Sequence, residues 1–379
     1  MPVVVGYFPN WRIYSAPPYE PSDIPLHKLT HINYAFGKLE PDGTICFSDP
    51  WADIQKDFPG DSPDQPAKGC IHQLATALKG RNPAVRILLS VGGWTGSAHF
   101  SPVAANPAAR HRFVHSAAQL LARYNLDGLD IDWEFPVKGG EEGNHRSPDD
   151  AKHFAFLLYE LRMHFTHLSN TCLNNKYLEL TIATSAAPHI YTCVNMREIS
   201  QYVDFINLMT YDYAGSWTST VQHHSALYQS TPCTHDAICT DATVRGYIAA
   251  GVPPFKLVLG IPFYGRGFTG VSSPTIGLPH KGSAKSPVSN EDCFAYDEIK
   301  HMIHHPSKCW ELIHDGPSAS SILYDRKAQI WIGIEDLWSV RKKVEYIKRM
   351  GLLGGMTWEL SQDRGAELLS VMSMGLLGR

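Results

Sequence analysis

Three acidic residues alternate with apolar residues in one short segment of the chain. Residues 127–134 read Asp-Gly-Leu-Asp-Ile-Asp-Trp-Glu. Successive side chains of a strand point to opposite faces, so Asp130, Asp132 and Glu134 share one face and the apolar residues share the other. Like charges this close cannot all ionise cheaply, so at least one carboxyl pKa must rise. A carboxyl group that stays protonated near neutral pH can act as a general acid, and Glu134, the last of the three, is the one that a substrate can reach.

A metal site or a chance grouping would also place acids close together in the chain. A carboxylate cluster can bind Ca²⁺ or Mg²⁺, but such a site takes about six oxygen ligands from a flexible loop. A chance grouping is disfavoured because Asp is depleted in strands. The row therefore predicts acid–base catalysis, with no metal and no cofactor.

The segments that would position these acids are short apolar runs bounded by Gly, Pro, Asn or Asp. Such runs are typical of parallel strands that are buried on both faces. They cover residues 3–8, 30–36, 86–91, 128–133, 178–183, 205–209, 256–262 and 354–358. Helical patterns lie between them, for example at 104–124, 148–167 and 340–350. Eight strands alternating with helices predict an α/β fold, a (β/α)₈ TIM barrel with its site at the carboxyl ends of the strands. An open doubly wound sheet is the alternative, but no Gly-x-Gly-x-x-Gly turn follows the first strand.

The segment between the last two predicted strands is much longer than the other connections between strands. About ninety residues separate them, whereas a βα unit needs only some thirty. A strand-like segment at 330–332 and a helix-like one at 296–304 predict a small α+β insertion between strand 7 and strand 8. We therefore expect the barrel at residues 1–265 and 340–379 and the insertion domain at 266–339.

Composition excludes several classes of function. The 379 residues carry Lys+Arg 33 against Asp+Glu 37, a net charge of −4, so no basic field is available to hold nucleic acid. The hydrophobic content of 44% excludes disorder as the main state. No stretch approaches the ~18 apolar residues of a membrane-spanning helix, and the first segment lacks a signal-peptide pattern. We expect a monomer that binds neither nucleic acid nor membrane.

The chain has eight cysteines, and their number indicates whether the protein works in an oxidising or a reducing compartment. An even number in loop-like surroundings favours disulfides and secretion, with Cys233/Cys239 and Cys293/Cys309 as the natural pairs. Free buried thiols are the alternative. The nineteen histidines lack the close Cys or carboxylate partners of a zinc site, so we expect them on the solvated surface.

Several motifs carry a resemblance to a known family. Residues 127–134 resemble the D-G-x-D-x-D-x-E signature of glycoside hydrolase family 18 chitinases, in the subgroup with an α+β insertion domain. Residues 90–94 (Ser-Val-Gly-Gly-Trp) are similar to its S-x-G-G motif, and residues 209–212 (Met-Thr-Tyr-Asp) to its M-x-Y-D motif. Residues 259–266 and 354–359 resemble the blocks of strands seven and eight. The motifs occur in the family's order over nearly the whole chain.

The resemblance implies a retaining chitinase that cuts β-1,4 bonds between N-acetylglucosamine units. In this family the substrate's own acetamido oxygen attacks the anomeric carbon, forming an oxazolinium intermediate, while one acid protonates the leaving oxygen. Glu134 would be that acid. Asp132 would orient the amide, Asp130 would share a proton with Asp132, and Tyr211 would donate to the acetamido oxygen.

Further positions follow from the same resemblance. Tyr7 and Ser90 would hydrogen-bond Asp130 from behind. The expected substrate-binding residues are Trp358 beneath the cleaved sugar, Trp94 and Trp217 on the leaving side, Trp11 toward the non-reducing end, and Asp212, Arg266, Met209, Tyr264 and Phe36. Arg266 could instead only pair with an acid. The expected partners are chitin and N-acetylglucosamine oligosaccharides.

Two rival functions are compatible with much of the same sequence. A chitin-binding lectin on the same barrel would lack the acid, whereas Glu134 is present here. An endo-β-N-acetylglucosaminidase acting on N-glycans uses similar acids but needs room for a branched glycan, which the insertion opposes.

Overall fold

Eight parallel strands close into a barrel in the computed structural model, which describes residues 1–59, 61, 68–230, 238–305 and 309–379. The closed order is β1-β2-β4-β5-β6-β7-β8-β15, with β15 pairing back to β1. These strands are β1 (Val3–Pro9), β2 (His31–Leu39), β4 (Arg86–Gly92), β5 (Gly128–Asp132), β6 (Glu179–Ser185), β7 (Phe205–Met209), β8 (Leu257–Pro262) and β15 (Gly354–Trp358). A short strand, β3 (Ile45–Phe47), pairs antiparallel with the end of β2.

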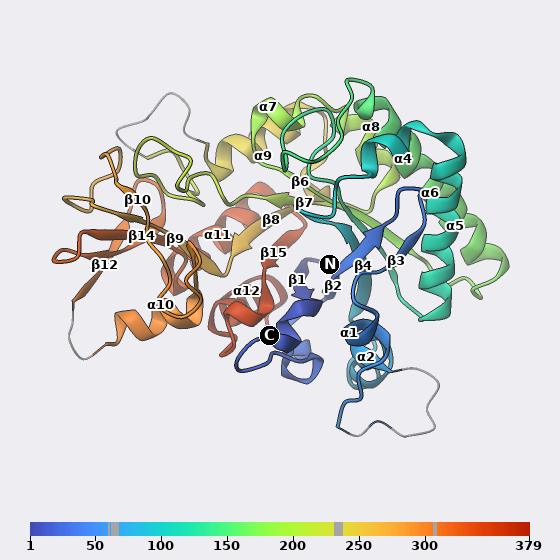
Figure 1. Cartoon of the computed structure of the whole chain (residues 1–379), viewed down its shortest axis with the longest axis horizontal. Coiled ribbons are helices and arrows are strands. Elements are labelled where there is room, and N and C mark those ends of the chain that lie inside the picture. Colours follow the sequence, from blue (N-terminus) through green and yellow to red (C-terminus); the bar gives the residue numbers. More distant parts are fainter. Residues whose placement is uncertain (60, 62–67, 231–237, 306–308) are drawn as a thin grey trace.

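Helices surround the barrel because its strands are apolar on their outer faces as well. Residues such as Leu129, Ile131 and Ile182 point outward and pack with helix residues in one large buried cluster. Figure 1 shows α4, α5 and α6 together on one side of the barrel. The helices are α1 (Pro50–Ile54), α2 (Gly69–His72), α3 (Lys79–Arg81), α4 (Phe100–Ala105), α5 (Pro107–Arg123), α6 (Asp150–Thr171), α7 (Pro188–Tyr191), α8 (Met196–Tyr202), α9 (Thr240–Ala249), α10 (Tyr296–Ile303), α11 (Leu337–Met350) and α12 (Glu367–Leu377).

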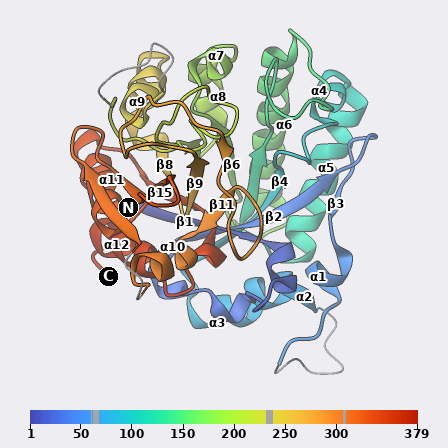
Figure 2. The ribbon, with the colours of Figure 1, turned by 60° about the vertical axis from the view of Figure 1, so that its left-hand side comes forward.

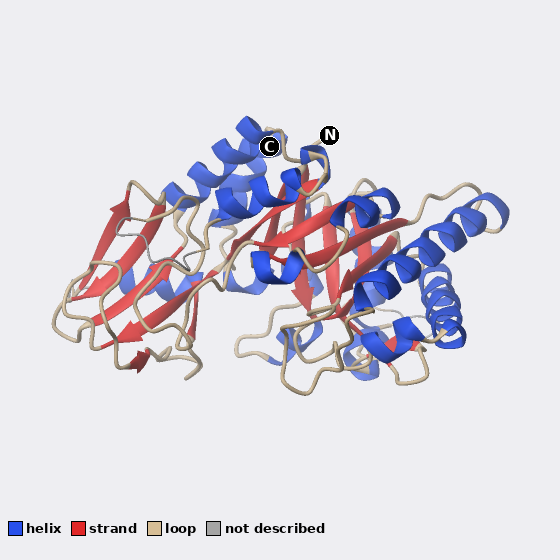
Figure 3. Ribbon diagram, turned by 90° about the horizontal axis from the view of Figure 1, so that it is seen from above, coloured by secondary structure: helices blue, strands red, loops and turns tan. Residues whose placement is uncertain are grey.

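A second, antiparallel sheet lies between β8 and β15 in the chain. Its order is β10-β9-β14-β13-β12, with β11 also paired to β9. The strands are β9 (Tyr264–Thr269), β10 (Gly282–Ser283), β11 (Cys293–Ala295), β12 (Trp310–Asp315), β13 (Ser320–Asp325) and β14 (Ile330–Ile334). Figure 3 shows its strands as a group separate from the barrel strands, and Figure 2 shows α10 beside it. β9 begins two residues after β8 ends, so the sheet starts at the carboxyl end of the barrel.

The eight predicted barrel strands and the (β/α)₈ class are confirmed; the bounds of β7 and β15 are as predicted, and the other strand ends differ by at most three residues. The helix expected over 104–124 is instead two helices. Pro107 begins α5, and the Asn106 side chain caps it by accepting hydrogen bonds from the backbone N–H of Ala108 (2.9 Å) and Ala109 (3.3 Å). Proline at the first helical position lacks the N–H that would continue α4. The proposed domain bounds at 265/266 and 339/340 stay a prediction.

The expected disulfide between Cys293 and Cys309 is not formed. Cys293 is a free thiol whose Sγ accepts a long contact from Gln362 Nε2 (3.8 Å), at the junction of β11 with the barrel. Its side chain is therefore directed to the barrel, whereas Cys309 is exposed just before β12. Cys233 lies outside the described residues, so its pairing with Cys239 stays a prediction. Secretion likewise stays a prediction.

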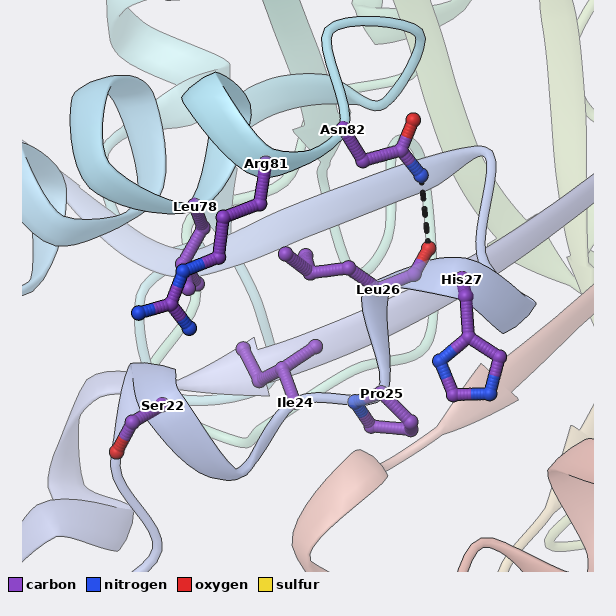
Figure 4. Close-up of a pocket in the computed structure, with 8 residues that line it drawn as sticks. All are labelled: Ser22, Ile24, Pro25, Leu26, His27, Leu78, Arg81 and Asn82. Atoms are coloured by element: carbon purple, nitrogen blue, oxygen red, sulfur yellow. Dashed lines mark hydrogen bonds between the residues drawn. The ribbon is translucent and has the colours of Figure 1, made fainter.

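A shallow pocket lies at the opposite end of the barrel from the acidic row. Its lining residues precede β2 and β4, so they sit at the amino ends of these strands, and Asn82 Nδ2 donates to the Leu26 carbonyl across it (3.2 Å; Figure 4). Sites in such barrels lie at the carboxyl ends, so this pocket is separate from the candidate site. In the part of the chain that the structure describes, no helix has both the length and the apolar character to cross a membrane.

Candidate active site

The acidic row lies where the alternation of β5 predicts. Leu129, Ile131 and Trp133 belong to the buried layer between strands and helices, and the Trp133 ring stacks on Phe100 (5.3 Å between centroids, 12° between planes). Asp130 and Asp132 therefore point into the barrel, and both are buried. Glu134 follows two residues after β5 ends and is partly exposed at the mouth.

Asp130 is the deepest of the three acids, and its carboxylate accepts hydrogen bonds from four strands. Oδ2 accepts from Tyr7 on β1 (2.7 Å) and Ser90 on β4 (2.8 Å). Oδ1 accepts from Thr181 on β6 (2.5 Å) and Asn207 on β7 (3.4 Å). Burial raises the pKa of Asp130, and these donors oppose that shift. Tyr7 and Ser90 lie where the family resemblance implies, whereas no sequence pattern pointed to Thr181 and Asn207.

Asp132 is buried one step nearer the mouth. Its Oδ1 has no hydrogen-bond partner among the described residues. Burial raises the pKa of Asp132 well above its ordinary value, and the charges of Glu134 and Asp130 raise it further. An unsatisfied buried carboxyl oxygen is costly unless a ligand or water pairs with it. Asp132 is therefore poised to hydrogen-bond a group that enters the mouth.

The backbone of Glu134 is fixed on both sides. Its N–H donates to Ser97 Oγ (2.9 Å), and its carbonyl accepts from Asn144 Nδ2 (2.9 Å). Burial and then the charge of Asp212 raise the pKa of Glu134 to about 8. At neutral pH this carboxyl group is protonated, which is the form that can donate a proton.

Tyr211 and Asp212 lie two and three residues after β7 ends, close enough to the acidic row to interact with it electrostatically. Among the described residues, the Tyr211 hydroxyl makes one long contact, with Met356 Sδ (3.9 Å). Burial, followed by the charges of Asp132 and Glu134, raises the pKa of Tyr211 well above its ordinary value, so the hydroxyl stays a hydrogen-bond donor. Asp212 has a φ of 57°, a left-handed conformation that Asp tolerates better than most residues.

Asp212 is held by residues of β9. Tyr264 Oη donates to its Oδ1 (2.8 Å), and Arg266 binds both oxygens through Nε (2.6 Å) and Nη2 (2.9 Å). Arg266 Nη1 also donates to Asp292 Oδ1 (3.2 Å). Partial burial would raise the pKa of Asp212, but the hydrogen bonds and charge of Arg266, with His224 nearby, hold it below its ordinary range. Asp212 is therefore ionised beside Glu134.

An aromatic floor closes the centre of the barrel mouth. The ring of Trp358, at the end of β15, stacks with Phe36 (5.8 Å, 20°) and lies 5.6 Å from Tyr7 and 6.4 Å from Trp11. Gly93 permits this packing, because a Cβ at that position would lie 2.6 Å from the Phe36 ring. Met209 belongs to the same inner cluster.

Three tryptophans present exposed faces around this floor. Trp11 is 42% exposed, Trp94 51% and Trp217 59%, and each follows the carboxyl end of a barrel strand. The Trp217 ring is covered on one side by the Arg266 guanidinium (5.0 Å). Exposed indole faces at the mouth are suited to stack on sugar rings. The site residues predicted from the sequence are thus gathered at one end of the barrel.

The expectation that all histidines are solvated is wrong. His223 and His224, in the loop after β7, are 5% and 2% exposed. His223 Nε2 is 3.1 Å from Asp315 Oδ2 of β12, so the second sheet covers it. Their sequence neighbours gave no periodic signal for burial, because a loop is buried only when a distant segment packs over it.

A closed parallel barrel with acids at the carboxyl ends of its strands is typical of (β/α)₈ enzymes. The family model described as glycosyl hydrolases family 18 matches residues 3–363, and the chain belongs to this family.

Similar proteins extend over the same length of the chain. Chitinase A1 of Niallia circulans is 36% identical over 411 aligned residues, which cover 98% of this chain and 58% of that protein. The chain therefore spans little more than half of that relative. Among solved structures, chitinase ChiA74 from Bacillus thuringiensis has a TM-score of 0.91 at 30% identity, covering 100% of this chain and 70% of that one. A mutant of the Ostrinia furnacalis Group II chitinase catalytic domain 2, in complex with (NAG)5, has a TM-score of 0.88 at 29% identity, covering 100% and 97%.

The electrostatics of the site predict how Glu134 titrates. We expect its carboxyl to lose its proton near pH 8, and to do so at lower pH in Asp212→Asn, because the Asp212 charge is one of the two causes of the raised pKa. Carboxyl ¹³C NMR of glutamate-labelled protein measures this. Asp315→Asn, which changes a carboxylate of β12, should leave the titration in place. An unchanged titration in Asp212→Asn would contradict the assigned cause.

Proposed function

We propose that the protein is a chitinase, which hydrolyses β-1,4 bonds between N-acetylglucosamine units. The observation that carries the proposal is the placement of Glu134 at the barrel mouth, two residues after a buried Asp132 that lacks a partner for Oδ1 among the described residues; the pKa of Glu134, raised to about 8, suits a proton donor. Membership of family 18 and the chitinases among its relatives support the same substrate class. No cofactor or metal is part of the proposal.

The proposed reaction retains the configuration of the cleaved sugar. The acetamido carbonyl oxygen of the sugar attacks C1 while the bond from C1 to the leaving oxygen breaks, and Glu134 gives its proton to that oxygen. The products of this step are the leaving sugar and an oxazolinium ion. Water then attacks C1 from the vacated side and gives a proton back to Glu134, and the ring opens to restore the acetamido group.

Within this proposal the other polar groups bind the acetamido group. Asp132 Oδ1 accepts from the amide N–H and, when its carboxyl group is ionised, offsets the positive charge of the intermediate, while the Tyr211 hydroxyl donates to the amide oxygen. Asp130 takes its four hydrogen bonds from the barrel strands and so supports Asp132 from below. The proton that we expected the two aspartates to share remains a hypothesis.

The remaining residues would hold the sugar chain. Trp358 would lie beneath the cleaved sugar, Trp94 and Trp217 under the leaving sugars, and Trp11 under sugars toward the non-reducing end. Arg266 uses three N–H groups on Asp212 and Asp292, which leaves two for sugar hydroxyls. Residues 266–339 would form an insertion domain that walls one side of the groove. We further propose a secreted monomer.

The two rival functions are weaker on specific grounds. A lectin needs no proton donor, yet Glu134 is present with a raised pKa. An endo-β-N-acetylglucosaminidase must admit a branched glycan, and we propose that the second sheet, which starts at the carboxyl end of β8, limits the room for a branch. Chitin oligomers therefore suit the site better.

Removal of the proton donor tests the proposal most directly. Glu134→Gln should lower kcat on N-acetylglucosamine oligomers by about 10²- to 10⁴-fold, because an amide cannot give up a proton to the leaving oxygen. Oligomer affinity, measured by calorimetry, should stay nearly constant. Glu142→Gln, which changes an exposed glutamate of the same loop, is the control. Near wild-type turnover in Glu134→Gln would refute the assignment.

The role of the acetamido group has its own test. A fully deacetylated oligomer should resist cleavage, because an amine has no carbonyl oxygen to attack C1. The fully acetylated hexamer should give the β-anomer first, as followed by ¹H NMR early in digestion. Rapid hydrolysis of the deacetylated oligomer, or an α-anomer as first product, would exclude the proposed mechanism but not the substrate class.

The exposed tryptophans predict a loss of affinity. Trp94→Ala or Trp217→Ala should weaken hexamer binding by ~1–3 kcal/mol, since each removes an aromatic face from a sugar ring. Phe255→Ala is a matched control, because Phe255 is 63% exposed just before β8, at the opposite end of the barrel. Binding titrations that find equal affinities in all three variants would rule out the platforms.

A further inference from the structure

His224 is a buried histidine directly behind a carboxylate of the candidate site. It lies in the loop between β7 and α9 and is 2% exposed. Its Nδ1 is 3.9 Å from Asp212 Oδ1, which is beyond hydrogen-bond distance but close enough for a strong electrostatic interaction. Neither ring nitrogen has a hydrogen-bond partner among the described residues. Buried polar groups without partners are rare in folded proteins and call for a physical reason.

The packing around the imidazole prevents it from turning toward solvent. Its ring lies 5.3 Å from that of Tyr264, whose hydroxyl donates to Asp212. On another side it faces β14, where an added Cβ on Gly333 would lie 3.6 Å from His224 Cδ2. The two nitrogens therefore remain inside the protein, with the Asp212 carboxylate beside them.

The loop that carries His224 is anchored on both sides of this residue. Ser225 Oγ donates to the Thr210 carbonyl (2.7 Å) and accepts from the buried Lys343 of α11 (2.6 Å). His223 contacts Asp315 of β12. The backbone carbonyl of His224 accepts from the N–H of Tyr213 (3.0 Å), next to Asp212. The position of the imidazole relative to Asp212 is therefore set by the fold.

The groups that face His224 come from three elements. Asp212 lies in its own chain segment after β7, Tyr264 and Arg266 lie on β9, and Glu335 follows β14 and is paired with Lys343. Burial lowers the pKa of His224. Asp212 opposes this shift, Arg266 adds to it, and Glu335 opposes it. The imidazole is thus neutral near pH 7 and gains a proton only in the acid range.

We infer that His224 is a positioning residue for the site: when it gains a proton it forms an ion pair with Asp212 and removes part of the negative charge beside Glu134. The inference rests on the proposed function, in which Glu134 is the acid and the intermediate is cationic. A neutral His224 leaves Asp212 fully charged, and this charge helps to keep Glu134 protonated. A protonated His224 draws Asp212 toward itself, and its positive charge lies near the site in which the cationic intermediate forms. Activity should therefore fall toward acid pH as His224 is protonated.

The pH–rate profile of a matched pair of variants tests this inference. His224→Gln keeps a polar side chain that cannot be protonated, so the acid limb of kcat/KM should move to lower pH. Between pH 7 and pH 5, kcat/KM of His224→Gln should fall by a factor that is about one third, or less, of the wild-type factor. A threefold difference corresponds to a shift of about half a pKa unit. His223→Gln changes the neighbouring buried histidine, which contacts Asp315 instead, and should keep the wild-type acid limb. An unchanged acid limb in His224→Gln would overturn the inference.

A second measurement requires no catalysis and no folded His224 variant. The imidazole of His224 in the wild-type chain is titrated by ¹H–¹⁵N NMR and compared with the same signal in Asp212→Asn. The pKa of His224 should fall in that variant, because the carboxylate that favours the imidazolium is lost. Equal titrations would refute the coupling even if chitin oligomers are cleaved. A coupled titration with no hydrolysis of oligomers would instead sustain the His224–Asp212 pair and refute the proposed function.

Discussion

The site depends on one electrostatic constraint, namely that three carboxylic acids share the inside of a single barrel. Water cannot solvate all of them, so each must be stabilised by hydrogen bonds or remain protonated. Asp130 is stabilised by hydrogen bonds, with donors from β1, β4, β6 and β7. Glu134 remains protonated, with its pKa raised to about 8. Asp132, between them, keeps one oxygen without a partner among the described residues, available for a ligand.

The barrel makes this arrangement rigid. Each donor to Asp130 lies on a different strand, and the strands are fixed by parallel pairing and by the helices packed outside. Gly92 shows how close the packing is, since its φ is 116° and an added Cβ would lie 2.1 Å from the Asp132 carbonyl oxygen. Such preorganisation matters because an acid–base group displaced by about 1 Å loses much of its effect.

Residues of the second sheet also influence the charges at the site. Tyr264 and Arg266 are on its strand β9 and hold Asp212 ionised next to Glu134, while His224 lies behind Asp212 under β14. A carboxylate thus held near a protonated acid raises the pKa of that acid. The second sheet therefore helps to set the charges at the barrel mouth.

The sequence by itself determined the barrel strands and the face that carries the acids. Both follow from local patterns, namely unbroken apolar runs and the two-residue period of a strand. Resemblance to the family located Tyr7 and Ser90, which donate to the deepest acid, and Tyr211 and Asp212, which lie near the mouth. Only the tertiary structure decided which neighbours satisfy the acids, as with Thr181 and Asn207, and which loop residues are buried, as with His224. Those outcomes, like the free thiol of Cys293, depend on contacts between segments far apart in the chain, and no local pattern encodes such contacts.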